Sequence, residues 1–232
     1  MPAQTQIRSG LTGNQLKIIA MIAMTCDHVG LQLFPGAAWL RWIGRLALPI
    51  YAYMIAEGCR YTRDRKKYLF RLAGMAALCQ IVYFFAMGSL YQCILVTFSL
   101  AVCVIYGVDS VNKGKKPVPM WKVVAVSIGI GAGCDFVCIL LPKLVPGFYI
   151  DYGIWGVMLP VFVYFGRRKW AWLTAGLVLL ALEFGGDQWL ALGAVPLLML
   201  YNGQRGKAKI GRLFYWYYPL HLVVIYGLSL IV

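Results

Sequence analysis

The sequence contains few charged residues, and acidic residues are the scarcest of them. Charged side chains make up 13% of the 232 residues, with 8 aspartates and glutamates against 22 lysines and arginines. A soluble globular domain has about 25% charged residues, so this composition excludes an ordinary soluble domain. Because 61% of the residues are hydrophobic and apolar runs recur from end to end, we predict a polytopic membrane protein.

Several motifs that would define other classes are also missing. The chain has no glycine-rich phosphate loop, internal repeat or low-complexity segment, and its first apolar segment lacks a small-residue cleavage site, so we expect that segment to remain as a span. The seven cysteines, an odd number, do not suggest a disulfide framework. Cys134 and Cys138 flank Asp135, but thiols filling helix contacts explain them better than a metal site, so no metal is predicted.

Nine apolar segments approach or exceed the length of about 20 residues that a membrane helix needs. Helices are required because an open sheet in lipid leaves backbone groups unsatisfied. The chain has no room for an additional soluble domain, so the predicted fold is an all-α transmembrane bundle in a single domain, residues 1–232. The nine segments are 16–34, 38–58, 68–87, 90–108, 119–141, 151–166, 170–184, 187–201 and 213–231.

The distribution of positive charge predicts the orientation of these segments. With the N-terminus in the cytoplasm, all but three of the 22 basic residues fall on the inner side, and the exceptions are Arg41, Arg45 and Lys143. This arrangement satisfies the positive-inside rule at every loop. An odd number of spans then places the C-terminus outside. The net charge of +14 therefore indicates topology and contact with anionic lipid of the inner membrane, and nucleic-acid binding is not expected.

Asp27 and His28 are adjacent ionisable residues inside the first apolar segment. Such groups are costly at membrane depth, and they commonly face a cavity, a partner charge or a proton path. With a rise of about 1.5 Å per residue, His28 lies about 17 Å beyond Lys17, and His221 lies about 14 Å beyond Arg212. The two histidines of the chain are therefore predicted to share one layer near the midplane.

Further polar residues are candidates for binding a substrate. Adjacent helix residues point about 100° apart, so Asp27 and His28 need separate partners. Arg41 and Arg45 share a helix face near the outer rim, and either one can pair with Asp27 or bind an acidic group of a substrate. Asp135 is placed somewhat farther out and is the third candidate. A purely structural role in helix packing is the alternative for each position taken singly.

A dense basic segment is expected on the inner side, between the second and third apolar segments. It holds six basic residues from Arg60 to Arg71. Topogenic charge alone explains such a segment, but it is also dense enough to hold a phosphate-bearing cofactor. Glu57 precedes it and is expected to form a local salt bridge. The candidate cofactor contacts are Arg60, Arg63, Lys67 and Arg71.

A set of short motifs runs through most of the chain. They are Leu16–Ala20, Met24–Gly30, Gly44–Tyr51, Glu57–Gly58, Thr62–Arg63, Lys67–Tyr68, Arg71–Leu72, Tyr152–Val157 and Tyr218–Leu222. Together these motifs resemble the TraX family, and the combination of Asp-His-x-Gly with Gly-Arg-x-Ala-x-Pro is the most specific part. The chain departs from the family pattern at Gln80, where members often have glutamate, and at Gln92 or Cys93, where many have asparagine.

The resemblance implies an integral membrane acyltransferase, of the kind named for acetylating the N-terminus of pilin in conjugation. It implies acyl-CoA, acetyl-CoA in particular, as the donor, which would enter from the cytoplasm with its phosphates on the basic inner loops. The acceptor would be an amine or hydroxyl of a protein N-terminus, a peptide, a small amine or a glycan, approaching from the outer side. The sequence gives no indication of oligomeric state.

The residues and the resemblance together suggest one mechanism. His28 is the candidate base that takes a proton from the acceptor. Asp27 is expected to pair with Arg45 or to stabilise a protonated imidazole, and His221 is the second candidate base or a donor to the thioester carbonyl. An acyl-enzyme on Cys26 is the weaker alternative, because an apolar setting raises the pKa of a thiol. The runner-up function is a proton-coupled transporter or flippase in which the Asp and the histidines relay protons. A structural membrane partner is third.

Overall fold

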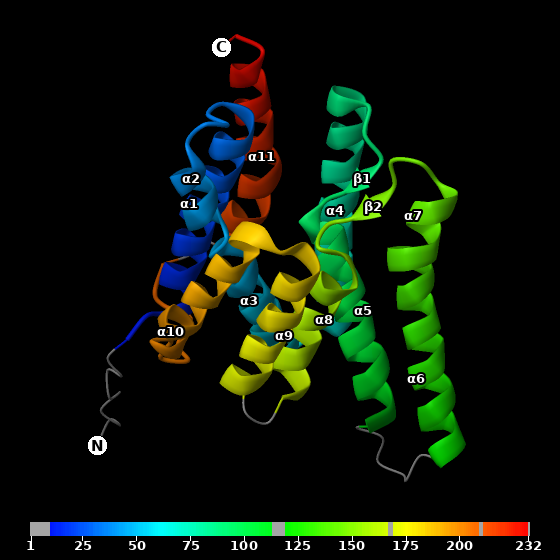
Figure 1. Ribbon diagram of the computed structural model, residues 1–232. Helices are drawn as coiled ribbons and strands as arrows, with labels where there is room; N and C mark the ends of the chain where they lie inside the picture. Colours follow the sequence, from blue (N-terminus) through cyan, green and yellow to red (C-terminus); the bar gives the residue numbers. More distant parts are fainter. Residues whose placement is uncertain (1–9, 113–118, 167–168, 209–210, 232) are drawn as a thin grey trace, which may run out of the picture. The chain divides into compact units, whose positions relative to one another are not determined.

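The computed structural model describes residues 10–112, 119–166, 169–208 and 211–231, and these are mostly helical (Figure 1). The all-α class predicted from composition is confirmed. The described helices follow the predicted apolar segments in order, although several segments are broken into shorter pieces. The described residues divide into two compact units. That the chain forms a single domain stays a prediction.

The first unit combines the two ends of the chain, Met1–Met54 and Asp187–Val232. Its elements are α1 (Gly13–Gln32), α2 (Ala38–Gly44), the first half of α3 (Ala47–Tyr61), nearly all of the 3-10 helix η2 (Gly186–Gly193), α10 (Ala194–Met199) and α11 (Gly211–Ser229). α1 packs against both α2 and α11, and Figure 1 shows the three helices together. This packing brings the first, second and last predicted segments together.

The start of α1 is held by the chain that precedes α11. Thr12 forms a capping box with Gln15, which satisfies donors at the first turn of the helix. The backbone N–H of Gly13 donates to the carbonyl of Gln204, 2.8 Å away. Because the first turn of a helix has N–H groups without partners inside the helix, these contacts fix where α1 begins.

The second predicted segment, 38–58, is broken into α2 and α3 at Arg45 and Leu46. Pro49 explains the break, because it has no N–H to donate to the carbonyl of Arg45 four residues earlier. Where the sequence indicated one continuous segment, the structure therefore has two helices. The break lies at Arg45 itself, so it sets the position of a candidate binding residue.

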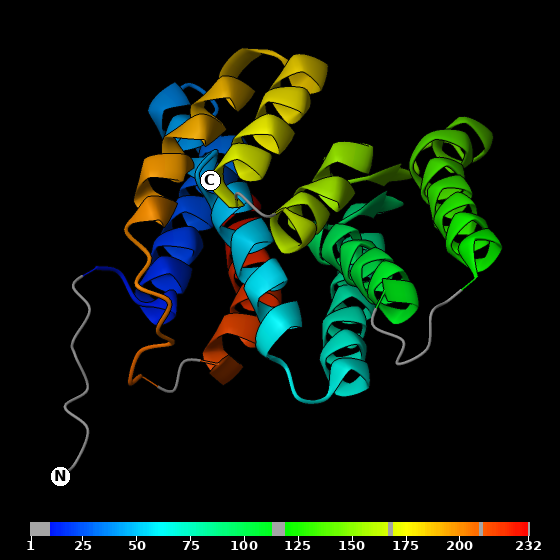
Figure 2. The same cartoon turned by 90° about the horizontal axis from the view of Figure 1, so that it is seen from below.

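The second unit, Ile55–Gly186, contains most of the apolar helices. Besides the end of α3 its elements are α4 (Arg65–Met87), β1 (Tyr91–Gln92), α5 (Ile94–Asn112), α6 (Met120–Asp135), the π-helix η1 (Phe136–Leu140), α7 (Leu141–Leu144), β2 (Tyr149–Ile150), α8 (Gly153–Phe165) and α9 (Lys169–Phe184). α5 packs against α4, α6 and α8, and α8 packs against α9. Figure 2 shows these helices from below. β1 and β2 form one short parallel pair.

An ion pair with a buried carboxylate joins the start of α4 to the end of α5. Arg65 binds the carboxylate of Asp109, and the hydroxyl of Tyr164 on α8 donates to the same carboxylate at 3.3 Å. Asp109 is 3% exposed. One buried charge thus links three helices, which fits the rule that buried carboxylates are paired and hydrogen-bonded.

Two described helical stretches are long and apolar enough to cross a bilayer, Arg65–Phe85 and Ile94–Val111. α8 and α9 are apolar but have only 13 and 16 residues. At 1.5 Å per residue they reach about 20 and 24 Å, against a hydrocarbon core of about 30 Å. The sixth and seventh predicted segments are therefore short as helices too, and the number of spans and their orientation stay predictions.

Candidate active site

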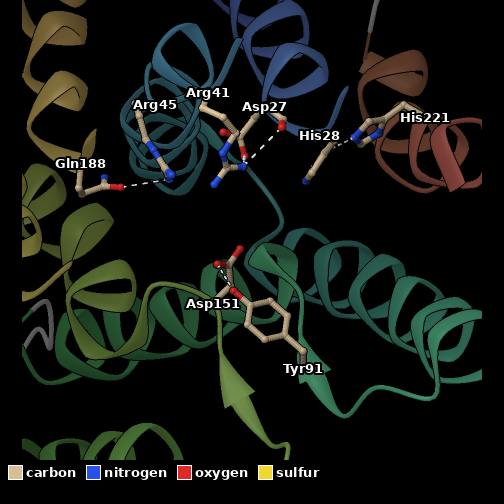
Figure 3. A network of polar contacts seen from close by, with 8 residues as sticks. All are labelled: Asp27, His28, Arg41, Arg45, Tyr91, Asp151, Gln188 and His221. Atoms are coloured by element: carbon tan, nitrogen blue, oxygen red, sulfur yellow. Dashed lines mark hydrogen bonds and ion pairs between the residues drawn. The ribbon is translucent and has the colours of Figure 1, made fainter. Parts of the chain in front are cut away.

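The two histidines of the chain are hydrogen-bonded to each other in the first unit (Figure 3). His28 comes from α1 and His221 from α11, and Nδ1 of His28 lies 2.8 Å from Nε2 of His221. His221 is 7% exposed and His28 is half-buried. The sequence analysis placed the two histidines in one layer near the midplane, which stays a prediction, and the structure brings the two rings into direct contact.

The hydrogen bonds determine which ring nitrogens carry protons. Nδ1 of His221 lies 2.9 Å from the backbone carbonyl of Tyr217, and because a carbonyl only accepts, this nitrogen carries a proton. In a neutral His221 ring Nε2 is then an acceptor, and Nδ1 of His28 donates to it. A neutral His28 ring therefore has its lone pair on Nε2. Within the described part of the chain this nitrogen has no hydrogen-bond partner, so it is available to accept a proton.

Aromatic side chains of α11 hold the histidine pair in place. Tyr217 stacks on His221 with ring centroids 5.2 Å apart and an interplanar angle of 7°. The hydroxyl of Tyr217 donates to Oγ1 of Thr25 on α1, since the proton of Thr25 goes to the carbonyl of Met21. Tyr218 meets both imidazole rings edge-on. These contacts tie α1 to α11 around the pair.

Asp27 forms its ion pair with Arg41 of α2. Oδ2 of Asp27 accepts from Nη1 of Arg41 at 2.8 Å. Arg41 thus takes the place that the sequence-based mechanism gave to Arg45. The reason lies in helix geometry. Arg41 and Gly44, at i and i+3, lie on the face of α2 that meets α1, whereas Arg45 lies at the break that ends the helix.

Two glycines allow α1 and α2 to approach closely enough for this pair. A Cβ at Gly44 would lie 2.4 Å from the Cβ and Oδ1 of Asp27. A Cβ at Gly30 would lie 2.8 Å from the Cβ of Leu40. Both distances are too short for real atoms, so a side chain at either position would push the helices apart. The glycines of the Asp-His-x-Gly and Gly-Arg motifs therefore serve one helix contact.

Arg45 contacts Gln188, a residue that the sequence analysis did not single out. Nη1 of Arg45 donates to Oε1 of Gln188 at 3.4 Å (Figure 3). Gln188 lies on η2 and is 4% exposed. Among the described residues, the buried atoms Nε2 of Gln188 and Oδ1 of Asp27 have no hydrogen-bond partner. Such an atom costs about 1–3 kcal/mol, so the cluster is one that a further polar group would stabilise.

Asp135 belongs to a different unit from this cluster. It is the last residue of α6, immediately before η1, and its side chain is exposed. It belongs to the second unit, whereas the histidine pair belongs to the first. A role for Asp135 in substrate binding stays a prediction.

Arg60 is bound by the protein itself. Its guanidinium donates to the carbonyls of Val163 and Tyr164, 2.6 and 2.5 Å away, and to Oε1 of Glu57 at 3.0 Å. The local salt bridge predicted for Glu57 is thereby confirmed. Because the last carbonyls of a helix have no partners within it, Arg60 satisfies the end of α8.

The remaining candidate cofactor contacts lie at and just before the start of α4. Asp64 caps this helix by accepting from the backbone N–H of Lys67 at 2.8 Å. The cap uses the backbone N–H of Lys67 and not its side chain. The candidates with exposed side chains are Arg63, Lys67 and Arg71.

A second polar cluster, which the sequence analysis missed, lies at β1 and β2 of the second unit (Figure 3). The hydroxyl of Tyr91 donates to Oδ1 of Asp151 at 2.6 Å, and that of Thr97 donates to the carbonyl of Asp151 at 2.8 Å. The carboxylate oxygen only accepts, so the phenol of Tyr91 is the donor in this contact. Tyr152 follows with a left-handed φ of 58°. Hydrophobic periodicity carries no signal for such a turn.

The two departures from the family pattern meet in the second unit. The side-chain amide of Gln80 donates to the carbonyl of Tyr91 at 2.9 Å and accepts from the backbone N–H of Cys93 at 3.3 Å. Both unusual positions therefore belong to one contact between α4 and the chain that leads into α5.

Comparison with known proteins agrees with the motifs. The family described as TraX protein matches residues 12–229. A protein of Dichelobacter nodosus named "Probable fimbrial assembly protein FimC, serogroup H1" is 27% identical over 243 residues, covering 91% of this chain and 93% of that protein. An uncharacterized protein of Rickettsia prowazekii (strain Madrid E) is 50% identical over 38 residues, 16% of this chain and 15% of that protein. No solved structure matches. Because the family match includes both histidines and extends over nearly the whole sequence, the chain belongs to the TraX family.

Proposed function

We propose that this protein is an integral membrane acyltransferase that moves an acyl group, first of all acetyl, from acyl-CoA to an amine or hydroxyl acceptor. The observation that carries the proposal is the pair of His28 and His221, whose hydrogen bonds leave Nε2 of His28 as an acceptor. Acyl transfer to an amine or a hydroxyl needs a base beside the acceptor, because the proton must leave as the new bond forms. Imidazole is suited to this task near neutral pH.

The proposed step is a direct transfer. The acceptor nitrogen or oxygen bonds to the thioester carbonyl carbon, and Nε2 of His28 takes the acceptor proton. The carbon–sulfur bond then breaks, and the sulfur leaves with the electron pair and receives that proton from His28. The products are the acylated acceptor and the free CoA thiol, and His28 is neutral again. Cys26 takes no part in this step.

The neighbours of His28 act through it. His221 and the carbonyl of Tyr217 fix the ring so that its lone pair is on Nε2. When His28 takes up a proton, its bond to Nε2 of His221 becomes charge-assisted and therefore stronger. The ion pair of Asp27 with Arg41 holds α1 against α2 at the residue before the base.

The exposed basic residues near the start of α4 are the proposed contacts for the phosphates of acyl-CoA. Lys67 and Arg71 share one helix face at i, i+4, and Arg63 lies just before the helix. Arginine and lysine at such a position bind phosphate through charge-assisted hydrogen bonds. Arg60 is left out of this proposal because its guanidinium binds Glu57 and the end of α8.

The proposed location is the inner membrane, with nine spans, the N-terminus in the cytoplasm and the C-terminus outside. The two long apolar helices and the positive-inside pattern support this arrangement. The relative from Dichelobacter nodosus is named for fimbrial assembly, which favours a protein N-terminus, such as that of a fimbrial or pilin subunit, as the acceptor. We therefore rank that class ahead of a small amine or a glycan.

The test is transfer by the purified protein. Acetyl-CoA labelled in the acetyl group is incubated with the protein in nanodiscs and with a peptide whose only nucleophile is its α-amine. We expect the label on that amine, located by mass spectrometry, and none on the same peptide with a blocked N-terminus. A monodisperse protein that labels neither peptide, amine nor glycan acceptors would contradict the proposal. Solute flux driven by a pH gradient would then favour the proton-coupled transporter.

A further inference from the structure

The side-chain amide of Gln188 is buried, and among the described residues only its oxygen has a hydrogen-bond partner. Gln188 is 4% exposed, and its Oε1 accepts from Nη1 of Arg45 at 3.4 Å. A guanidinium only donates, so the oxygen of the amide, and not its nitrogen, must face Arg45. This orientation turns the NH₂ group away from Arg45. There, among the residues that the structure describes, Nε2 has no acceptor.

The polar cluster around this amide has an excess of positive charge. Arg41 forms an ion pair with the carboxylate of Asp27, and the amide that Arg45 contacts on η2 is neutral. Two guanidiniums and one carboxylate give a positive sum, and Asp187, next to Gln188, is exposed to solvent. Figure 3 shows the side chain of Arg45 between those of Gln188 and Arg41. A positive cluster with a buried, unused donor favours an anion as its further ligand.

We propose that Gln188 and Arg45 form a subsite for an oxygen anion, a carboxylate or a phosphate, carried by the acyl acceptor. The inference rests on the proposed function in one respect, namely that the ligand is the acceptor. Two N–H donors from separate elements, one of them charged, match the two oxygens of such a group. The subsite belongs to the same unit as His28. It would therefore select acceptors that bear an acidic group as well as the nucleophile that His28 deprotonates.

The alternative is that Gln188 only holds Arg45 in place. The substitution Gln188→Glu separates the two roles, because a carboxylate accepts from Arg45 better than an amide does but repels an anion. If the role is only to hold Arg45, Gln188→Glu keeps or improves function. If the subsite binds an anion, Gln188→Glu loses binding. The exposed Gln32 of α1 is the matched control, since Gln32→Glu adds the same charge to the same unit.

The experiment measures the melting temperature of the purified full-length protein with small probes. Glycylglycine supplies a carboxylate, glycylglycinamide is its match without one, and inorganic phosphate is the second anion. A ligand that binds only the folded state raises the melting temperature. We expect glycylglycine or phosphate to raise it and glycylglycinamide to have no effect. Gln188→Glu should bind the anion at least about tenfold more weakly, and Gln32→Glu should behave as the wild type.

An equal shift in Gln188→Glu and the wild type, or no shift with any anion in the wild type, would overturn the subsite. If Gln188→Glu is not monodisperse, Gln188→Leu replaces it, and that variant must also lose the shift. If the melting temperature differs only between nanodiscs of phosphatidylglycerol and nanodiscs of phosphatidylcholine, the anion is a lipid headgroup. That result would overturn the assignment to the acceptor. Binding does not require acyl transfer. If the melting temperature shifts in a way that depends on Gln188 but no acyl transfer occurs, the subsite stands and the proposed acyltransferase function fails. If acyl transfer occurs without the shift, the function stands and the subsite fails.

Discussion

At the scale of single residues, the chemistry depends on which nitrogen of His28 carries a proton. The carbonyl of Tyr217 fixes the proton on Nδ1 of His221, so Nε2 of His221 accepts from Nδ1 of His28. The lone pair of His28 is then on its Nε2. Replacing His221 disturbs this arrangement but leaves the base in place. Replacing His28 removes the base. Substitutions of the two histidines are therefore expected to have different effects on the transfer rate, although the two rings are hydrogen-bonded to each other.

The variant His28→Ala is expected to remain folded and to bind acyl-CoA but to lose transfer by about 10² to 10⁴, the usual contribution of a general base. His221→Ala should lose less. Initial rates of acetyl transfer, measured beside monodispersity in size-exclusion chromatography, check this. Cys26→Ala is the control and should keep its rate, and its inactivation would instead indicate an acyl-enzyme. Unchanged turnover in His28→Ala would move the assignment to His221 or Asp27.

The pH dependence of the rate tests the same assignment. Protonation of His28 fills the lone pair on Nε2 and so removes the base, while Nδ1–H still donates to Nε2 of His221. The rate should fall as the pH is lowered, and the residual rate of His28→Ala should lack this fall. Far-UV circular dichroism over the same pH range controls for unfolding. A rate that increases toward acid pH would contradict the role of His28.

At the scale of elements, the contact between α1 and α2 depends on Gly44. In Gly44→Ala the new methyl group would lie 2.4 Å from Asp27, so the helices must separate, at a cost of about 1–3 kcal/mol. We expect a lower melting temperature and reduced transfer, because α1 also carries His28. Gly74→Ala in α4 is the control, since that position is open and alanine favours a helix over glycine by up to about 1 kcal/mol. Equal melting temperatures of the two variants would show that the close contact is not required.

The roles of Arg60 and Arg63 are expected to separate in stability and donor binding. Arg60→Gln removes the guanidinium from the buried Glu57 and from the last turn of α8, so it should lower stability by on the order of 2 kcal/mol or more. Arg63→Gln should leave the melting temperature unchanged and raise the KM for acetyl-CoA. Thermal melts and steady-state kinetics on both proteins check this. A stable Arg60→Gln protein with a raised KM would return Arg60 to the donor site.

At the scale of the whole molecule, the prediction concerns topology. All but three of the 22 basic residues fall on one side when the N-terminus is placed in the cytoplasm, and nine spans then put the C-terminus outside. A periplasmic reporter fused after Val232 should therefore be active, and a cytoplasmic reporter at the same position inactive. Fusions in the loop before Lys67 should show the reverse pattern. A C-terminus in the cytoplasm would mean that one of the short segments, such as that of α8, does not span.

Helix class, segment order and the choice of candidate residues could be predicted because they depend on local properties. Apolar length, the rarity of charge and an ionisable pair inside a hydrophobic run are all visible in the sequence, and so is the helical rise that puts His28 and His221 at similar depth. The salt bridge of Glu57 with Arg60 is also local, at i, i+3. The break at Arg45 is an intermediate case, since Pro49 marks its place but not the direction of the chain beyond it.

The sequence by itself determined that the chain is mostly helical, with apolar segments that contain a few ionisable residues, because hydrophobicity and helix period are properties of each segment alone. Only the tertiary structure decided which faces meet. It paired Asp27 with Arg41, placed the carbonyl of Tyr217 so that His28 keeps a lone pair, and buried an amide at Gln188. These contacts join residues that are distant in sequence, or they depend on where α2 ends. No local pattern encodes the rotation of one packed helix against another.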